Sequence, residues 1–372
     1  MRIHWLGLSS RASLMTAALL AVTGTTKSED SPATLKDAFK DCFRIGVALN
    51  QRQFTEQDTN GATLVKRQFN AISPENVMKW ANIHPRPGPD GYNFEAADRY
   101  VEFGEKNGMF IVGHTLVWHF QTPRWVLQGD GTNAATRELL LQRMRDHIHT
   151  VVGRYKGRIK AWDVVNEALN EDGTLRRSQW YRIIGEDYIV KAFEYAHEAD
   201  PSAELRYNDY AIENERKRDG VIALVKKLQA QKVPLGGLGS QTHANLTWPN
   251  AESLDTALTA FTELGIPISI TELDVTASQR GQLNQSAEVS QNGQAGEGGV
   301  VDGANQKLAE QYANFFRVFL KHRKNIELVT FWGVTDRDSW RRIGKPLLFN
   351  AEWQPKPAFH AVIAEAKKIS GQ

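Results

Sequence analysis

The sequence predicts a single closed barrel in which eight parallel strands alternate with helices. Short apolar or β-branched runs alternate with longer stretches whose apolar residues recur at helical spacing. Eight such runs occur in 372 residues, enough for a barrel, which typically needs about 250 residues and tolerates insertions. No glycine-rich phosphate-binding turn follows the first run, which argues against an open dinucleotide-binding sheet.

The predicted strands share one pattern, an apolar run that ends in polar residues. They are expected at residues 44–50, 69–76, 109–118, 159–167, 204–210, 235–243, 267–275 and 327–335. Helical periodicity between them is clearest at residues 97–106, 138–155 and 187–199. Strands that alternate with helices imply parallel βαβ units, so we expect one barrel domain over residues 35–370.

The N-terminal segment is typical of a secretory signal peptide. Arg2 and Arg11 supply positive charge, and residues 14–22 form an apolar core too short to span a bilayer stably. We expect residues 1–27 to be removed on export to the periplasm or the medium. No membrane association is expected afterwards.

One compositional break interrupts the barrel pattern. Residues 277–305, between the seventh predicted strand and its helix, are rich in Gly, Gln, Ser and Asn. They form an inserted loop, either a disordered insertion or a flap that contacts a polymer.

Charge and cysteine content exclude some classes of partner and bond. With 45 basic and 43 acidic residues there is no excess field to hold a polyanion, so nucleic acid is not an expected partner. Cys42 is the one cysteine, so no internal disulfide can form. We expect a monomer.

Polar and aromatic side chains gather where the predicted strands end. In a barrel of this type the reactive groups come from the C-terminal ends of the strands. Flat indole faces suit pyranose rings, while amides, carboxylates and imidazoles suit hydroxyls, so the expected site is a sugar-binding cleft. The strand-end residues are Glu75, Asn76, His114, Trp118, His119, Asn166, Glu167, Asn208, Asp209, Tyr210, Gln241, Thr242, His243, Glu272, Asp274 and Trp332.

Two of these carboxylates are the candidate catalytic pair. Glycosidic cleavage uses two carboxyl groups that flank the bond, and a barrel brings Glu167 and Glu272 to the same mouth. Asn166 could bind a sugar 2-hydroxyl beside Glu167. Asp274 and His243 could hold Glu272 oriented and ionised, as a nucleophile requires. The structural alternative for either glutamate is a salt bridge to a neighbouring Lys or Arg.

A metal site is the competing interpretation of the strand-end histidines. His114, His119 and His243 end three strands, but the close pair of ligands expected on a single strand is missing. We therefore expect neither a catalytic metal nor a cofactor.

Two segments carry a family resemblance. Residues 162–168 (Trp-Asp-Val-Val-Asn-Glu-Ala) and 270–274 (Ile-Thr-Glu-Leu-Asp) resemble the two active-site signatures of glycoside hydrolase family 10, mainly endo-β-1,4-xylanases. Residues 75–80, 113–119, 239–243 and 332–336, with Ser339 and Trp340, extend the match over almost the whole mature chain.

This resemblance implies a retaining endo-1,4-β-xylanase that acts on xylan and xylo-oligosaccharides. Glu167 would be the acid/base and Glu272 the nucleophile, with His243 and Asp274 orienting Glu272. Trp340 would crowd a C6 hydroxymethyl and so favour xylose. The candidate substrate-binding residues are Glu75, Asn76, Lys79, His114, Trp118, Asn166, Tyr210, Gln241, Trp332 and Trp340.

Two alternatives stay open from the sequence. The first is another retaining barrel glycosidase, acting on β-1,4-glucans or aryl glycosides. The second is a barrel that binds polysaccharide without cutting it; such proteins typically lack one of the two carboxylates, and both are present here. Phe120 and Ala211 depart from the family pattern and bear on subsite preference.

Overall fold

The computed structural model describes Met1, Arg2, His4 and residues 34–278 and 299–370. Residues 34–372 make up one compact unit, which contains every described helix and strand. The predicted signal peptide and most of the predicted inserted loop lie outside the described residues.

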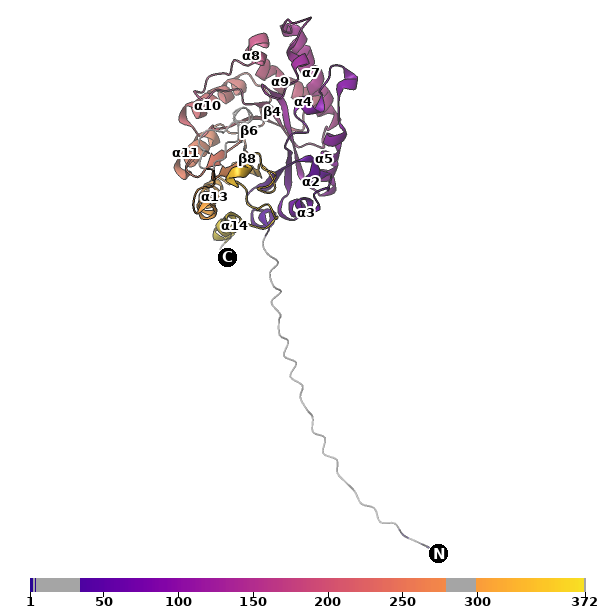
Figure 1. Ribbon diagram of the computed structural model, residues 1–372, viewed down its shortest axis with the longest axis vertical. Coiled ribbons are helices and arrows are strands. Elements are labelled where there is room, and N and C mark those ends of the chain that lie inside the picture. Colours follow the sequence, from indigo (N-terminus) through magenta and orange to yellow (C-terminus); the bar gives the residue numbers. More distant parts are fainter. Residues whose placement is uncertain (3, 5–33, 279–298, 371–372) are drawn as a thin grey trace. The chain divides into compact units, whose positions relative to one another are not determined.

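The described strands form a closed parallel barrel, which confirms the predicted fold class. The ring runs β1–β2–β3–β4–β5–β6–β8–β9 and closes where β9 pairs with β1, and the short β7 extends the edge of β8. Figure 1 shows the strands enclosed by helices. The strands are β1 Arg44–Leu49, β2 Ala71–Pro74, β3 Phe110–Trp118, β4 Ala161–Asn166, β5 Glu204–Asp209, β6 Gly237–Ser240, β7 His243–Asn245, β8 Ile268–Thr276 and β9 Ile326–Phe331.

The helices connect successive strands on the outside of the barrel. The α-helices are α1 Leu35–Ala38, α2 Gln51–Phe54, α3 Thr59–Gln68, α4 Trp80–Ile83, α5 Glu95–Lys106, α6 Arg124–Leu127, α7 Arg137–Arg154, α8 Gln179–Ile184, α9 Tyr188–Ala199, α10 Glu215–Ala230, α11 Ala251–Thr262, α13 Ala304–Lys321 and α14 Pro357–Ser370. Two short 3₁₀-helices, η1 Pro89–Gly91 and η2 Arg342–Gly344, lie in loops.

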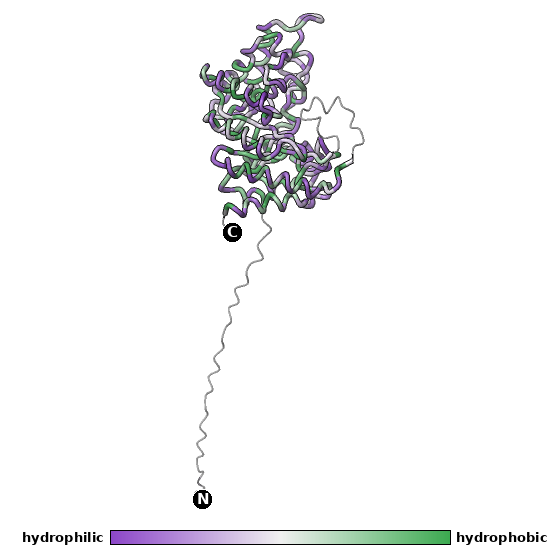
Figure 2. Tube along the Cα trace, turned by 90° about the vertical axis from the view of Figure 1, so that its left-hand side faces the viewer, coloured by the Kyte–Doolittle hydropathy of each residue, from purple (hydrophilic) through white to green (hydrophobic). Residues whose placement is uncertain are grey.

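Burial explains why these segments take these forms. The barrel strands are covered on both faces: β1 buries the apolar run of residues 45–49, and β8 is buried along its entire length. Each helix buries one stripe, as α5 does with Ala97, Tyr100 and Val101. Polar and apolar residues therefore alternate along the outer helices in Figure 2.

The sixth predicted strand is the main point at which the prediction and the structure differ. The sequence predicts one strand over residues 235–243, but the structure breaks it into β6 and β7. Thr242 lies at the break with φ 52°, a left-handed conformation that an extended strand cannot continue through.

The base of the predicted inserted loop is closed by backbone contacts. The Val301 amide donates to the Ala277 carbonyl at 3.1 Å, and Ser278 forms an antiparallel bridge with Val300. Helix α13 begins at Ala304, so it takes the last two residues of the predicted loop.

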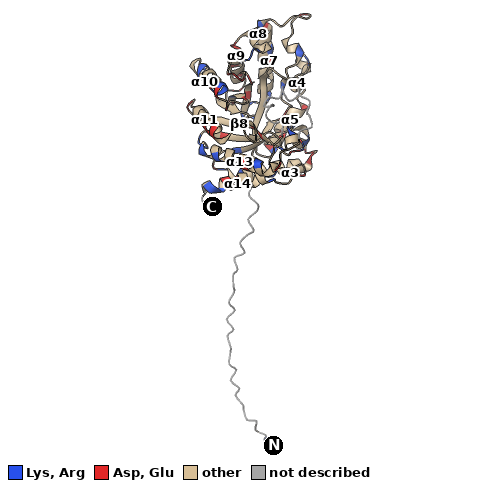
Figure 3. Cartoon of the chain, turned by 60° about the vertical axis from the view of Figure 1, so that its left-hand side comes forward, with Lys and Arg blue, Asp and Glu red and all other residues tan. Residues whose placement is uncertain are grey.

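Charges of both signs are interspersed over the outer helices, as Figure 3 shows. This agrees with the formal net charge of +2. Within residues 34–278 and 299–370, none of the helices has the length and apolar character needed to cross a bilayer.

Candidate active site

The two candidate carboxylates approach each other through a network of side-chain amides. Gln241 Nε2 donates to Glu167 Oε1 at 3.1 Å and lies 3.3 Å from Asn166 Oδ1. Asn208 Nδ2 donates to the same Asn166 oxygen and to Glu272 Oε1, both at 2.8 Å. The barrel thus joins two glutamates whose strands are three places apart in the ring, because β4 and β8 end at the same mouth.

Glu167 is a buried carboxylate with fixed neighbours. It follows the last residue of β4, is 3% exposed and has φ 57°. Trp118 Nε1 donates to its Oε2 at 2.9 Å, and Arg176 Nε donates to its backbone carbonyl at 3.1 Å. Both oxygens of the carboxylate therefore accept hydrogen bonds, one from an indole and one from an amide.

Glu272 is held by a histidine that a second carboxylate supports. Its Oε2 lies 3.2 Å from His243 Nε2, and His243 Nδ1 lies 3.1 Å from Asp274 Oδ2. Asp274 is fully buried and also accepts hydrogen bonds from Trp340 Nε1 at 2.8 Å and Arg341 Nη1 at 2.6 Å. This is the arrangement that the sequence predicted for these three side chains, with Arg341 added.

The charges around Glu272 favour its ionised form. Burial tends to raise the pKa of this carboxyl, but the hydrogen bond from His243 and the charges of His114, His243 and Lys79 lower it below the usual value of 4.5. Burial likewise tends to lower the pKa of His243, yet Asp274 and Glu272 raise it to about 9. At neutral pH the structure therefore presents an imidazolium to a carboxylate.

Lys79 is a buried cation that contacts Asn76 and Trp118 and lies close enough to Glu167 and Glu272 for the charges to interact. Its amine donates to Asn76 Oδ1 at 3.1 Å and lies 5.1 Å from the centre of the Trp118 ring. Burial lowers the pKa of Lys79, and the charges of Glu272, Glu75 and Glu167 oppose that shift. Burial raises the pKa of Glu75, which is half-buried, whereas Asn76 is exposed at the rim.

Two indoles and two imidazoles pack against one another beside Glu272. His114 Nδ1 lies 2.9 Å from Asp163 Oδ2, and the His114 ring meets the Trp332 ring edge-on at 5.3 Å. His243 lies 6.4 Å from the Trp332 ring and 4.9 Å from the Trp340 ring. Trp332 is buried and Trp340 half-buried, and both come from the chain after β9.

Tyr210 stands on the Glu167 side of the site. Its hydroxyl accepts a hydrogen bond from Arg176 Nη2 at 3.0 Å. Burial and a hydrogen bond to Glu171 raise its pKa well above 10. The phenol is therefore neutral at neutral pH.

Hydrogen bonds and ring contacts at the barrel mouth join most of the predicted site residues, and several further residues belong to this set. The strand-end pattern contained Asn208 but did not distinguish it from its neighbours. Arg176 and Arg341 lie in loops and gave no periodic signal, and Asp163 lies inside the fourth predicted strand rather than at its end. Within residues 34–278 and 299–370, no group of His, Cys, Asp or Glu is arranged to hold a metal ion.

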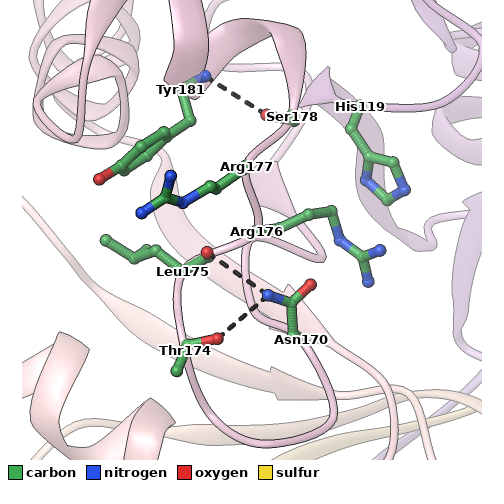
Figure 4. A pocket seen from close by; sticks show the side chains of 8 residues that line it. All are labelled: His119, Asn170, Thr174, Leu175, Arg176, Arg177, Ser178 and Tyr181. Atoms are coloured by element: carbon green, nitrogen blue, oxygen red, sulfur yellow. Dashed lines mark hydrogen bonds between the residues drawn. The ribbon is translucent and has the colours of Figure 1, made fainter.

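A cavity of about 690 Å³ is lined mainly by the loop that follows β4 (Figure 4). Asn170 Nδ2 donates to Thr174 Oγ1 at 3.1 Å and braces this loop. Arg176 lies in the wall and contacts both the Glu167 backbone and Tyr210. The lining residues are His119, Asn170, Thr174, Leu175, Arg176, Arg177, Ser178 and Tyr181.

A parallel barrel with two buried carboxylates among amides and indoles at its mouth defines the class of barrel glycoside hydrolases. A sequence model of glycosyl hydrolase family 10 matches residues 34–365. The chain belongs to this family.

Relatives extend over most of the chain. A β-1,4-xylanase of Dictyoglomus thermophilum is 39% identical over 359 residues, 94% of this chain and 96% of its own length. The structure of a family 10 endoxylanase from a sugarcane soil metagenome superposes with a TM-score of 0.82 at 41% identity, covering 89% of this chain and 99% of that one.

An intracellular xylanase of Thermoanaerobacterium saccharolyticum is also similar, with a TM-score of 0.79 and 39% identity over 90% of this chain and 99% of that one. Two of its variants, each with one glutamate replaced by alanine, are solved with xylotriose and with xylotetraose. The two replaced glutamates lie 105 positions apart in that enzyme.

Proposed function

We propose that this protein is a retaining endo-1,4-β-xylanase in which Glu272 is the nucleophile and Glu167 the acid/base. The amide network that joins the two buried carboxylates carries this proposal, because it holds both in one chain of hydrogen bonds at the barrel mouth. The spacing of the pair supports it, since Glu167 and Glu272 are 105 positions apart, as are the two replaced glutamates of the Thermoanaerobacterium enzyme.

The two carboxylates have different neighbours, which divides their roles. Glu272 faces the imidazolium of His243, so it is ionised and oriented to attack the anomeric carbon. Glu167 accepts hydrogen bonds from two neutral side chains, the Trp118 indole and the Gln241 amide. It protonates the leaving oxygen as the glycosyl-enzyme forms, then removes a proton from the water that releases the sugar.

The remaining predicted residues bind the chain of sugars. Glu75, Asn76 and Lys79 would hold the glycone side. Trp332 and Trp340 would pack on a sugar, and Asp274 fixes the Trp340 indole through its N–H. That fixed position would crowd a C6 hydroxymethyl, so xylan is preferred to a β-1,4-glucan. The substrates are xylan and xylo-oligosaccharides, bound without a cofactor.

The stereochemistry of the first product tests the mechanism. NMR of a xylo-oligosaccharide digest should show the β-anomer first, followed by slow mutarotation to the α-anomer. An α-anomer as the first product would rule out the covalent scheme and imply that a water fits between the carboxylates. Rates on xylan and on carboxymethyl cellulose separate the xylanase from the glucan alternative.

Substitution of each glutamate tests the assignment of roles. Glu272→Gln should lower xylan hydrolysis by roughly 10⁴-fold or more, because no nucleophile remains. With an activated aryl xylobioside, azide should rescue Glu272→Gly to an inverted glycosyl azide and Glu167→Ala to a retained one. Glu198→Gln is the control, since Glu198 is an exposed partner of Arg145 on an outer helix. The same azide product from both variants would contradict the two roles.

The N-terminal segment and the assembly are also proposals. Residues 1–27 direct export, and the mature protein is a secreted or periplasmic monomer that binds neither membrane nor nucleic acid. Edman sequencing of the exported protein should begin near residue 28 and light scattering should give the monomer mass. An intact Met1 on exported protein would contradict the signal peptide.

A further inference from the structure

Three consecutive residues between β6 and β7 serve both candidate catalytic carboxylates. Gln241 donates to Glu167 at 3.1 Å, and His243 contacts Glu272 at 3.2 Å. Thr242 lies between them and is fully buried. The conformation of this single residue therefore sets the relative placement of the two groups that hold the glutamates.

Thr242 has a backbone conformation that its side chain disfavours. Its φ is 52°, in the left-handed region, which is a genuine outlier for a β-branched residue. A conformation of this kind persists only where the surrounding structure over-determines it. The question is then which contacts hold Thr242 in place.

A buried carboxylate outside the catalytic site provides those contacts. Glu213, in the loop between β5 and α10, is 4% exposed. Its Oε1 accepts hydrogen bonds from Ser240 Oγ at 2.8 Å and from Thr242 Oγ1 at 3.0 Å. The two hydroxyls lie 2.9 Å apart, so one oxygen clamps both sides of Gln241.

Within the described part of the chain, the side chain of Glu213 has no side-chain hydrogen bond other than those to Ser240 and Thr242. No ion pair to it occurs there, and its Oε2 accepts no hydrogen bond from those residues. Burying a carboxyl group without a cation is costly, so this site is poorly suited to stability alone.

We infer that Glu213 is a positioning residue that locks the Gln241–Thr242–His243 turn and thereby aligns Glu167 and Glu272 together. The inference rests on the proposed function, since it assumes that those two carboxylates perform the reaction. Glu213 itself contacts neither of them and would not touch substrate.

Release of this turn should have a signature in the pH profile. The charged groups that face Glu272 are His243, His114 and Lys79. If His243 moves away, burial dominates and the pKa of Glu272 rises. The acid limb of kcat/KM then moves to higher pH, an effect that a general loss of stability does not produce.

Glu213→Ala is the central variant. On an activated aryl xylobioside, kcat/KM should fall roughly 10- to 100-fold, as for other supporting residues of an active site, and the acid limb should rise by at least about half a pH unit. Glu213→Gln should stay close to wild type, because its amide oxygen can accept both hydroxyls.

Rescue by glycine makes the test specific. Glycine adopts a positive φ without an anchor, so Thr242→Gly added to Glu213→Ala should restore most of the rate and the original acid limb. Asp200→Asn is the matched control, a buried carboxylate that accepts from Ser202 Oγ at 2.6 Å and the Gly157 amide at 2.8 Å, remote from the mouth. It should lower stability without moving the acid limb.

The outcomes separate this inference from the proposed function. An unmoved acid limb in Glu213→Ala, or no rescue by Thr242→Gly, would overturn the positioning role. If Glu213→Ala does not fold, the test uses Thr242 instead. Thr242→Ala must then move the acid limb of kcat/KM to higher pH, and Thr242→Ser must leave it in place. If the wild type cuts no xyloside, the proposed function fails. In that case the inference is tested without activity, by NMR titration of His243 in Glu213→Ala. A pKa of His243 unchanged from wild type would refute the positioning role of Glu213.

Discussion

His243 shows how a single residue takes its charge from its neighbours. The imidazole lies between Asp274 and Glu272, which outweigh the effect of burial and raise its pKa to about 9. A neutral histidine here would leave Glu272 without its nearest cation. The two carboxylates therefore depend on each other through this one side chain.

Asp274→Asn tests that dependence. We expect the pKa of His243 to fall from about 9 toward its usual 6.5, and that of Glu272 to rise in consequence. The acid limb of kcat/KM should move to higher pH, and NMR titration of His243 should report the lower pKa.

A second Asp–His pair provides the control. Asp255 Oδ1 lies 2.7 Å from His322 Nε2 on the outer helices. Asp255→Asn should leave the pH profile of the reaction unchanged. An unshifted His243 titration in Asp274→Asn would show that Asp274 does not set the charge of the histidine.

At the scale of single elements, the end of α10 shows a local conflict between sequence and backbone. The Val233 amide donates to the Leu228 carbonyl at 3.0 Å and the Lys232 amide donates to Gln229 at 2.9 Å, the two bonds of a Schellman motif. Lys232 has φ 57° at the position where glycine is preferred.

Lys232→Gly should stabilise the protein by about 0.5–1 kcal/mol, because glycine takes this conformation without a Cβ clash. The side chain is exposed, so no packing is lost. Urea unfolding measures the change, and Lys232→Ala, which keeps the Cβ, should show no such gain. Equal stability of the glycine and alanine variants would refute the role of the backbone.

At the scale of the whole molecule, the charges of the site contribute to the stability of the barrel. The folded-state pKa of His243, about 9, exceeds its usual 6.5, so its contribution is complete below pH 6.5 and is lost as pH rises through 9. The pKa values of Glu272 and Asp274 lie below 4.5 and 3.8, so their contributions are lost as pH falls below those values.

The free energy of unfolding should therefore decline between pH 6.5 and 9 by up to about 3 kcal/mol, since one pKa unit is worth about 1.4 kcal/mol. Urea unfolding across this range measures the slope. Asp274→Asn should flatten it. If Asp274→Asn leaves the pH dependence of the unfolding free energy unchanged, groups other than His243 cause the decline.

Much of the fold could be predicted from the sequence because its signals are local. Apolar runs that end in Asn166–Glu167 or lead into Glu272 mark both a strand and its reactive end, whatever the rest of the chain does. Once eight such runs close into a barrel, their polar ends must share one mouth. The candidate pair, and His243 with Asp274 beside it, followed from that geometry.

The sequence by itself determined the eight repeating strand–helix units and most of the side chains at their strand ends, since both follow from short-range periodicity. Only the tertiary structure decided where Thr242 breaks the sixth strand, that Asn208 and Gln241 join the two glutamates, and that Arg341 supports Asp274. These features depend on residues remote in the chain, whose packing selects one backbone conformation and one hydrogen-bond partner among several that the local sequence permits.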